Sequence, residues 1–211
     1  MKPRRPRIEA QEHFATWAPS YEGSFMWRHY FKPLHDIFEF HVLGIRGATI
    51  LDVGCGTGDI LRRFARAGAT RVVGVDQSAE MLDVAKGLSK NFGNIEYLQG
   101  SAEDLPLEDE TFDIVVSCVS FHHFPDAVGA LKEIDRVLQP LGKVMICDLT
   151  DQGIRGRLML AFGRLHRSDD HYYNMRSMTR MAREAGLDVT GCELIWNRPP
   201  TMLLFARKMH Q

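Results

Sequence analysis

Beyond Gly47 the chain alternates between short, nearly continuous apolar runs and longer segments whose apolar residues recur every three or four positions. The runs are typical of buried strands, whereas the longer spacing predicts amphipathic helices. The predicted strands are Ile50–Val53, Arg71–Asp76, Ile95–Leu98, Phe112–Val119 and Gly142–Cys147, and the predicted helices are Ile60–Ala67, Ser78–Leu88 and Asp126–Leu138. Continuous apolar strands separated by helices favour a parallel sheet covered on both faces. The pattern therefore predicts a doubly wound α/β fold.

The two ends of the chain have a different pattern. Helical spacing over residues 8–24 and 26–43 predicts an aromatic-rich helical prefix. Helical stretches near residues 154–165 and 176–185 are followed by two apolar runs, Val189–Trp196 and Met202–Ala206, which a short Pro-containing loop joins into an expected antiparallel pair. We expect one domain over 1–211, with a prefix or lid at 1–47, a core at 48–148 and substrate-side helices and final strands at 149–211. Its mostly parallel, seven-stranded sheet should have an antiparallel last strand.

The composition fits this single domain and argues against nucleic acid and a lipid bilayer as partners. With 211 residues, 45% of them hydrophobic, the chain can form one sizeable core. A net charge of −1 does not favour nucleic acid, and no apolar run reaches the length of about 18 residues that spans a bilayer. We therefore expect a cytoplasmic protein without stable membrane insertion. Its four cysteines are far apart and form no C-x-x-C pair, so we expect neither a metal site nor disulfides.

A tight loop with three glycines at alternate positions, Gly54, Gly56 and Gly58, follows the first predicted strand. Residues without a Cβ let the backbone turn sharply and approach a ligand closely. In an open α/β sheet, ligands bind beyond the carboxyl ends of the strands, where this loop should lie. The loop therefore predicts a small-molecule site.

Two carboxylates narrow the class of ligand. Asp76 ends the second predicted strand, 22 positions after Gly54, and a carboxylate there can accept both hydroxyls of a ribose. The dinucleotide pattern G-x-G-x-x-G requires a third glycine where Asp59 stands, and a carboxylate at that helix start should repel a pyrophosphate. A cofactor with one nucleoside and no phosphate fits better.

Four segments now carry a family resemblance. They are Asp52-x-Gly-x-Gly-x-Gly58, Asp76 at the end of its strand, Gly100-Ser-Ala-Glu-Asp-Leu-Pro106 and Phe112-Asp-Ile-Val-Val116. Together they resemble a class I S-adenosylmethionine-dependent methyltransferase. Within that superfamily, Ser120-Phe-His-His-Phe124 and the prefix Phe14-x-x-Trp-Ala-x-x-Tyr-Glu22 are similar to a small-molecule group that includes the quinone and sterol C-methyltransferases. The resemblance is strong over about residues 48–148.

The resemblance implies S-adenosylmethionine as cofactor, S-adenosylhomocysteine as product and a small-molecule acceptor. Asp52 and the glycine loop would hold the amino-acid end of the cofactor, and Asp76 would bind its ribose. Family members often have Asp or Asn where Ser101 stands, which shifts the expected adenine contact toward Ala102 and Glu103. The implied cofactor residues are Asp52, Gly54, Cys55, Gly56, Gly58, Asp76, Gln77, Met81, Ser101, Ala102, Glu103, Cys118 and Val119. Met81 is equally well interpreted as a core methionine.

Methyl transfer from a sulfonium needs alignment and exclusion of water more than it needs catalytic residues. An acceptor that must lose a proton could use a histidine base, and His122 and His123 follow the fourth predicted strand. At most one of them should face the acceptor; loop packing is the alternative. Trp17 and Tyr21 could close the site as a lid or could simply pack in the core.

Two other functions remain open at this stage. An NAD-type oxidoreductase is opposed by Asp59 and by the missing third glycine. A catalytically silent S-adenosylmethionine-binding protein would keep the same loop and the same Asp76. The acceptor and the methylated atom are not determined by the sequence.

Overall fold

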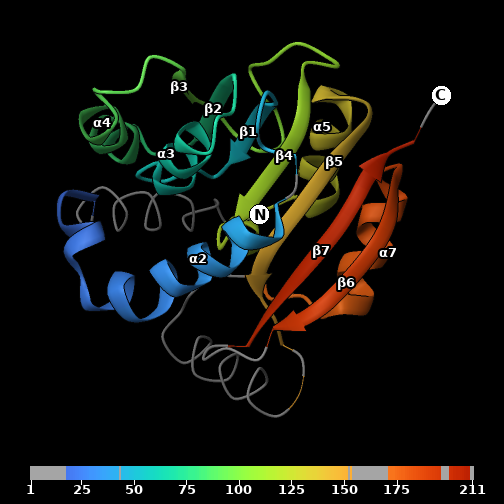
Figure 1. Cartoon of the computed structure of the whole chain (residues 1–211). Coiled ribbons are helices and arrows are strands. Elements are labelled where there is room, and N and C mark those ends of the chain that lie inside the picture. Colours follow the sequence, from blue (N-terminus) through green and yellow to red (C-terminus); the bar gives the residue numbers. More distant parts are fainter. Residues whose placement is uncertain (1–17, 43, 152, 154–170, 196–199, 210–211) are drawn as a thin grey trace, which may run out of the picture.

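The computed structural model describes residues 18–42, 44–151, 153, 171–195 and 200–209, and these residues are arranged as a central sheet flanked by helices (Figure 1). A 3₁₀ helix, Ala18–Gly23, and a π-helical turn, Trp27–Phe31, precede helix α2. The α-helices of the described residues are α2 (Lys32–His41), α3 (Asp59–Arg66), α4 (Ala79–Leu88), α5 (Ala127–Val137) and α7 (Met175–Glu184). The strands are β1 (Thr49–Val53), β2 (Arg71–Asp76), β3 (Ile95–Gln99), β4 (Phe112–Cys118), β5 (Leu138–Leu149), β6 (Leu187–Ile195) and β7 (Thr201–Lys208).

The strand order of the sheet is β3-β2-β1-β4-β5-β7-β6. Strands β3, β2, β1, β4 and β5 pair in parallel, whereas β7 is antiparallel to both of its neighbours. The chain proceeds outward from β1 to β2 and β3 on one side, then returns to place β4 and β5 on the other. This reversal makes the carboxyl ends of β1 and β4 the topological switch point, where ligands bind in open α/β sheets.

Each face of the sheet has its own hydrophobic core, because successive strand residues point to opposite faces. Leu51 and Val115 face a core that α5 and α7 cover. Ile50 and Val116 face a second core that contains Phe38 of α2 and residues of α3. In Figure 1, α2 accordingly crosses the front of the sheet. Both faces are buried, which explains the nearly continuous apolar character of the strands.

The predicted fold class, the seven-stranded sheet and the antiparallel last strand are confirmed. The helix expected over 26–43 is divided instead: the amide of Lys32 donates to the carbonyl of Trp27 in a π-type bond, and a regular helix starts only at Lys32. Pro33 in the first turn of α2 lacks an amide hydrogen, so it starts the helix more readily than it continues one. The helix expected near 154–165 and most of the one expected over 8–24 lie outside the described residues.

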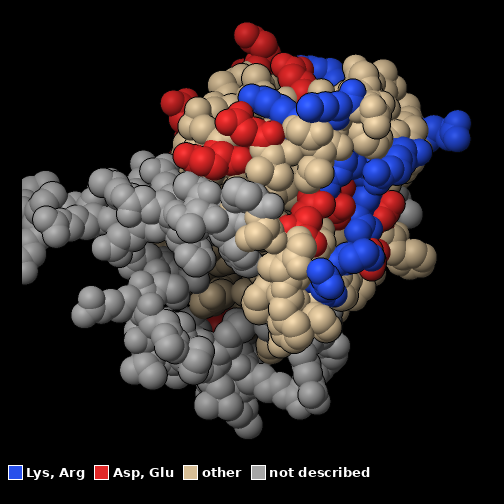
Figure 2. Space-filling model, turned by 90° about the vertical axis from the view of Figure 1, so that its left-hand side faces the viewer, with Lys and Arg blue, Asp and Glu red and all other residues tan. Residues whose placement is uncertain are grey.

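Positive and negative side chains are interspersed on the described part of the face that Figure 2 shows. This mixture agrees with the net charge of −1. Among the described residues, no helix combines the length and the apolar character that crossing a bilayer requires.

Candidate functional site

The glycine loop after β1 is fixed against the end of β2. The amides of Gly54 and Cys55 both donate to the carbonyl of Val75, at 2.8 and 3.1 Å. All three glycines have positive φ angles, of +77°, +51° and +76° at Gly54, Gly56 and Gly58. A Cβ on Gly54 would lie 2.6 Å from Ser120, whereas one on Gly56 would meet no atom of the described residues within 4 Å. The loop is thus tightly packed toward β4 and open at Gly56, where a ligand can approach the backbone.

Asp76, the last residue of β2, braces this loop. Its Oδ2 accepts from the amide of Gly56 at 2.8 Å, and its Oδ1 accepts from the amide of Ser78 at 2.9 Å. Burial raises the pKa of Asp76 above its ordinary value, although the amides of Ser78 and Gly56 and the nearby His123 oppose that rise. Each carboxylate oxygen has lone pairs beyond these bonds, so Asp76 can brace the loop and still accept from ligand hydroxyls.

Asp52, near the carboxyl end of β1, has one carboxylate oxygen without a partner among the described residues. Its side chain is buried, and its Oδ1 has no hydrogen-bond partner among the described residues. Burial and the neighbouring carboxylate of Asp76 raise the pKa of Asp52 to about 8. A buried carboxylate oxygen without a donor is energetically unfavourable. The pair of Asp52 and Asp76 therefore favours a ligand that brings a positive charge or hydrogen-bond donors.

The loop after β3 and the start of α4 border the same edge. The Ser101 hydroxyl donates to the carboxylate of Glu103, whose other oxygen accepts from the amide of Asp126 at 3.3 Å. Ala102 is buried, as is Met81, whose amide donates to the hydroxyl of Ser78 at the start of α4.

The carbonyl of Gln77 accepts from the side chain of Gln99 at 3.0 Å. This contact fixes the main chain between Asp76 and the start of α4, on the same edge of the sheet as Asp52 and the glycine loop.

The end of β4 contributes main chain more than reactive side chains. The thiol of Cys118 is buried, and burial together with Cys147 raises its pKa well above the ordinary value, so it stays protonated. Val119 has a φ of +55°, while its amide donates to the carbonyl of Cys147 at 2.7 Å. A β-branched residue in the left-handed region is strained, and such strain concentrates at functional sites. The backbone turns abruptly here, beside the glycine loop.

Of the two adjacent histidines, His122 is buried and His123 is exposed. Nδ1 of His122 lies 2.7 Å from Oδ1 of Asp148, and the amide of His122 donates to Oδ2 of the same carboxylate at 2.8 Å. The ring of His122 stacks on that of Tyr172, with centroids 5.5 Å apart and planes at 17°. An imidazole that donates from Nδ1 to a carboxylate presents Nε2 as its proton acceptor.

Asp148 was not predicted from the sequence, although the signal was there. It is a single acidic residue near the end of an apolar strand, as Asp76 is, and β5 lies next to β4 in the sheet. The rings of His122 and His123 have centroids 3.9 Å apart, and His123 lies close enough to influence the pKa of Asp76. Asp76, His123, His122 and Asp148 thus follow one another along the carboxyl edge of the sheet.

The prefix reaches this edge through Tyr21. Its ring lies against those of Trp27 and Phe31, with centroid distances of 5.2 and 5.8 Å. Burial and the groups around it, chiefly Cys118 and the carboxylate of Glu22, raise the pKa of the Tyr21 hydroxyl, which therefore stays protonated. Trp17, the other residue expected in a lid, lies outside the described residues.

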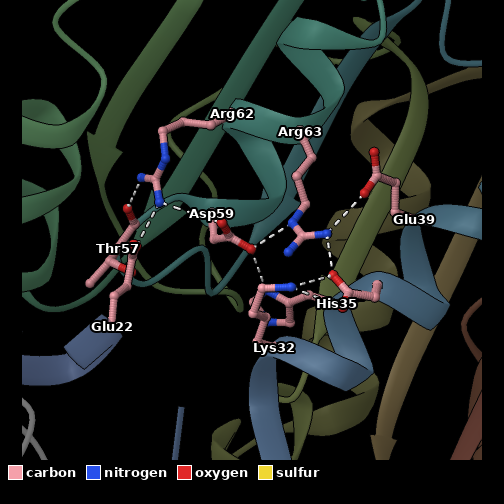
Figure 3. Close-up of polar contacts among 9 residues, drawn as sticks. Glu22, Lys32, His35, Glu39, Thr57, Asp59, Arg62 and Arg63 are labelled. Carbon is pink, nitrogen blue, oxygen red and sulfur yellow. Dashed lines mark hydrogen bonds and ion pairs between the residues drawn. The ribbon is translucent and has the colours of Figure 1, made fainter. Parts of the chain in front are cut away.

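The carboxylate of Asp59, which was expected to repel a pyrophosphate, is paired with cationic and hydrogen-bonding side chains. Its Oδ2 accepts from Arg63 at 2.7 Å and lies 3.0 Å from Nδ1 of His35 (Figure 3). Burial alone would raise the pKa of Asp59, but His35 and Arg63 outweigh it and lower the pKa to about 2. Its charge is therefore compensated by α2 and α3, and the idea that it repels a pyrophosphate loses its force.

Comparison with known proteins agrees with this geometry. A family model described as a methyltransferase domain matches residues 51–146. The chain is 41% identical over 109 residues to a demethylmenaquinone methyltransferase of Staphylococcus carnosus, covering 51% of this chain and 45% of that protein. A demethylmenaquinone methyltransferase of Bacillus licheniformis is 38% identical over 119 residues, covering 56% and 51%. The chain spans about half the length of the curated relatives it matches.

Solved structures show the same fold at low sequence identity. A complex between the Haloferax volcanii Trm112 methyltransferase activator and a methyltransferase gives a TM-score of 0.82 at 21% identity, covering 93% of this chain and 98% of that chain. The [4+2]-cyclase SpnF gives a TM-score of 0.72 at 19% identity, covering 85% and 81%. Since a cyclase shares the fold, the fold alone does not identify the reaction.

Proposed function

We propose that this chain, whose residues 51–146 match a methyltransferase domain, transfers a methyl group from S-adenosylmethionine to a small-molecule acceptor. The observation that carries the proposal is the buried Oδ1 of Asp52, which has no donor among the described residues. The amino-acid end of the cofactor offers an ammonium that suits this oxygen. The Cβ-free approach at Gly56 suits the same end of the molecule.

We assign the remaining cofactor contacts from the place of each residue along the carboxyl edge of the sheet. Asp76 accepts from the ribose hydroxyls, with Gln77 beside it. The buried Met81 and Ala102 would pack against the adenine, and the carboxylate of Glu103, which accepts from Ser101, would receive its amino group. Gly54, Cys55, Gly58, Cys118 and Val119 contribute main chain around the amino-acid end. When bound, the cofactor supplies an activated methyl group on a sulfonium.

Tyr21 acts as part of a lid. Its ring is anchored on Trp27 and Phe31, and its hydroxyl lies in the surroundings of Cys118 and Asp76. A neutral phenol in that position excludes water from the edge of the sheet without adding a charge. Trp17 belongs to the same proposal.

His122 accepts the proton that the acceptor loses. Asp148 holds the ring through Nδ1, so that Nε2 takes the proton and the resulting imidazolium stays beside a carboxylate. His122 is buried against this carboxylate, whereas His123 is exposed. We therefore assign the proton transfer to His122 rather than to His123.

The acceptor is a small hydroxylated aromatic molecule of the quinol type. This part of the proposal rests on the names of the relatives, demethylmenaquinone methyltransferases, and on the stacked rings of His122 and Tyr172, which form an aromatic wall beside the proposed base. A quinol must lose a hydroxyl proton to become strongly nucleophilic, which gives the base its task.

Two experiments test the function. Calorimetric titration with S-adenosylhomocysteine and with NAD should give binding of the first and none of the second; binding of NAD alone would refute the proposal. Transfer of labelled methyl from S-adenosylmethionine to a short-chain demethylmenaquinol should then be measured. Binding without transfer to this acceptor or to a metabolite extract would favour a catalytically silent protein.

His122→Ala and Asp148→Asn should both lower the single-turnover rate, and His123→Ala should leave most of it. Full rates in the first two variants across the pH range would remove His122 as the base.

A further inference from the structure

A carboxylate of the prefix contacts the glycine loop directly. Oε1 of Glu22, in the 3₁₀ helix Ala18–Gly23, accepts from the hydroxyl of Thr57 at 2.7 Å and from Nη2 of Arg62 at 2.6 Å (Figure 3). Thr57 lies between Gly56 and Gly58 and is buried. A residue 35 positions away in sequence is thus hydrogen-bonded to the middle of the loop.

Arg62 closes a three-residue cycle. Its Nη1 donates to the carbonyl of Thr57 at 2.6 Å, while its Nη2 donates to Glu22. Arg62 is only 5% exposed, and a second carboxylate oxygen, Oδ1 of Asp59, lies 3.6 Å from Nη2. Among the described residues Glu22 is therefore the closer anionic partner of a buried cation, and its loss leaves Arg62 with the longer ion pair to Asp59.

The cycle fixes the hydroxyl and the carbonyl of Thr57, and through them the two glycines on either side. The amide of Gly56 donates to Asp76, and Gly58 is the left-handed residue from which α3 starts. Glycines adopt many backbone conformations, so a loop of this composition keeps one geometry only if its neighbours hold it. Glu22 and Arg62 supply that restraint from outside the loop.

We propose that Glu22 is a positioning residue for the cofactor loop, so that docking of the prefix and binding of the cofactor are thermodynamically coupled. The inference rests on the proposed function of the loop. With Glu22 in place, Thr57 holds Gly56 and Gly58 in the geometry that receives the amino-acid end of the cofactor. Because coupling is reciprocal, bound cofactor also stabilises the docked prefix.

A second set of contacts provides the control. Arg63 of α3 donates to Glu39 of α2 at 2.9 Å and to Asp36 at 2.7 Å, and these ion pairs join the prefix to α3 without contacting Thr57 (Figure 3). Glu39→Gln therefore removes a carboxylate that joins the prefix to the same helix, and it leaves the Thr57 cycle intact.

The test is the affinity of the full chain for S-adenosylhomocysteine. Glu22→Ala should weaken binding at least tenfold, and Glu22→Gln by less, because an amide oxygen can still accept from Thr57 but offers Arg62 no charge. Glu39→Gln should stay within twofold of the wild type. A Glu22→Ala protein that binds with wild-type affinity would overturn the inference.

Further measurements separate positioning from a general loss of structure. If Glu22 acts through Thr57, the double variant Glu22→Gln/Thr57→Val should bind no more weakly than the worse single variant; fully additive losses would contradict the inference. Hydrogen exchange should show that the ligand protects residues 18–23 in the wild type and in Glu39→Gln, but less in Glu22→Gln, and equal protection in all three would refute the coupling. If Glu22→Ala fails to fold, Glu22→Gln decides: wild-type affinity together with wild-type protection of residues 18–23 would overturn the inference. A wild type that binds no S-adenosylhomocysteine would refute the proposed function itself, whereas weak binding by Asp76→Asn with normal binding by Glu22→Ala would refute only this inference.

Discussion

Replacing Asp52 with Asn removes an ionisable group that the folded protein holds in an unfavourable place. The shift of the pKa from 3.8 to about 8 corresponds to an upper limit of about 6 kcal/mol, at roughly 1.4 kcal/mol for each pKa unit. Between these two pH values folded Asp52 retains a proton that unfolded Asp52 has lost. Its contribution to stability is thus complete below about pH 4 and is lost as the pH rises toward 8.

Asn cannot ionise, so it resembles the protonated side chain at every pH. We therefore expect the ligand-free Asp52→Asn protein to match the wild type only below about pH 4. Its advantage in the free energy of unfolding should grow as the pH rises from 5 to 8, to several kcal/mol at most. Urea unfolding from pH 5 to pH 9 measures this difference. Asp135→Asn is a matched control, because Asp135 also has a buried oxygen without a partner among the described residues and a raised pKa, but it lies on α5, away from the ligand edge.

Binding of the cofactor should ionise Asp52, which is protonated in the ligand-free protein. At pH 6.5 a carboxyl with a pKa of about 8 is protonated, and an arriving ammonium favours its ionised form, so binding should release close to one proton. Calorimetric titration with S-adenosylhomocysteine in buffers of different ionisation enthalpy counts that proton. The Asp52→Asn variant should bind more weakly and release none. Equal proton release by both proteins, together with parallel stability curves, would refute this account of Asp52.

Three further substitutions probe the same edge of the sheet. Asp76→Asn should weaken the binding of S-adenosylhomocysteine by about 1–3 kcal/mol, as expected for a lost charge-assisted bond, and unchanged affinity in calorimetry would contradict the ribose assignment. Gly58→Ala should lower the free energy of unfolding by about 1–3 kcal/mol, because φ is +76° and the new Cβ overlaps the hydroxyl of Tyr97. Gly47→Ala, with φ of +80° and open space, should lose less than Gly58→Ala in the same unfolding assay, and equal losses would rule out the clash. Val119→Gly should change stability by less than about 1 kcal/mol, because relief at φ of +55° offsets the lost side chain, and a larger loss in thermal unfolding would rule out strain there.

Local signals were sufficient for the elements that frame the cofactor site. A short apolar run, alternating glycines and an acidic residue at a strand end are each readable within a few positions, and β1, its loop and Asp76 are where they were expected. The antiparallel end of the sheet was also predictable, because two apolar runs separated by a short loop have few other ways to pair. The proposed cofactor, S-adenosylmethionine, was inferred from the same segment, which lies within the residues that the methyltransferase domain model matches.

Interactions between distant segments were not predictable in this way. His122 and Asp148 are 26 positions apart, and they meet only because β4 and β5 are neighbours in the sheet. Asp59 illustrates the opposite error: its position at a helix start suggested a repulsive charge, but His35 and Arg63 compensate it. A carboxylate's partners depend on which helix packs beside it, and that is a property of the tertiary structure.

The sequence by itself determined the α/β pattern, the glycine loop and the position of Asp76 at a strand end, because backbone sterics and hydrophobic periodicity act within a few residues. Only the tertiary structure decided how these residues behave. It buries Asp52 beside Asp76 and so raises its pKa, and it brings Glu22 against Thr57 and Arg62. Burial and long-range pairing arise when the two faces of the sheet are covered, and the energies of ionisable groups depend on that covering more than on their neighbours in the sequence.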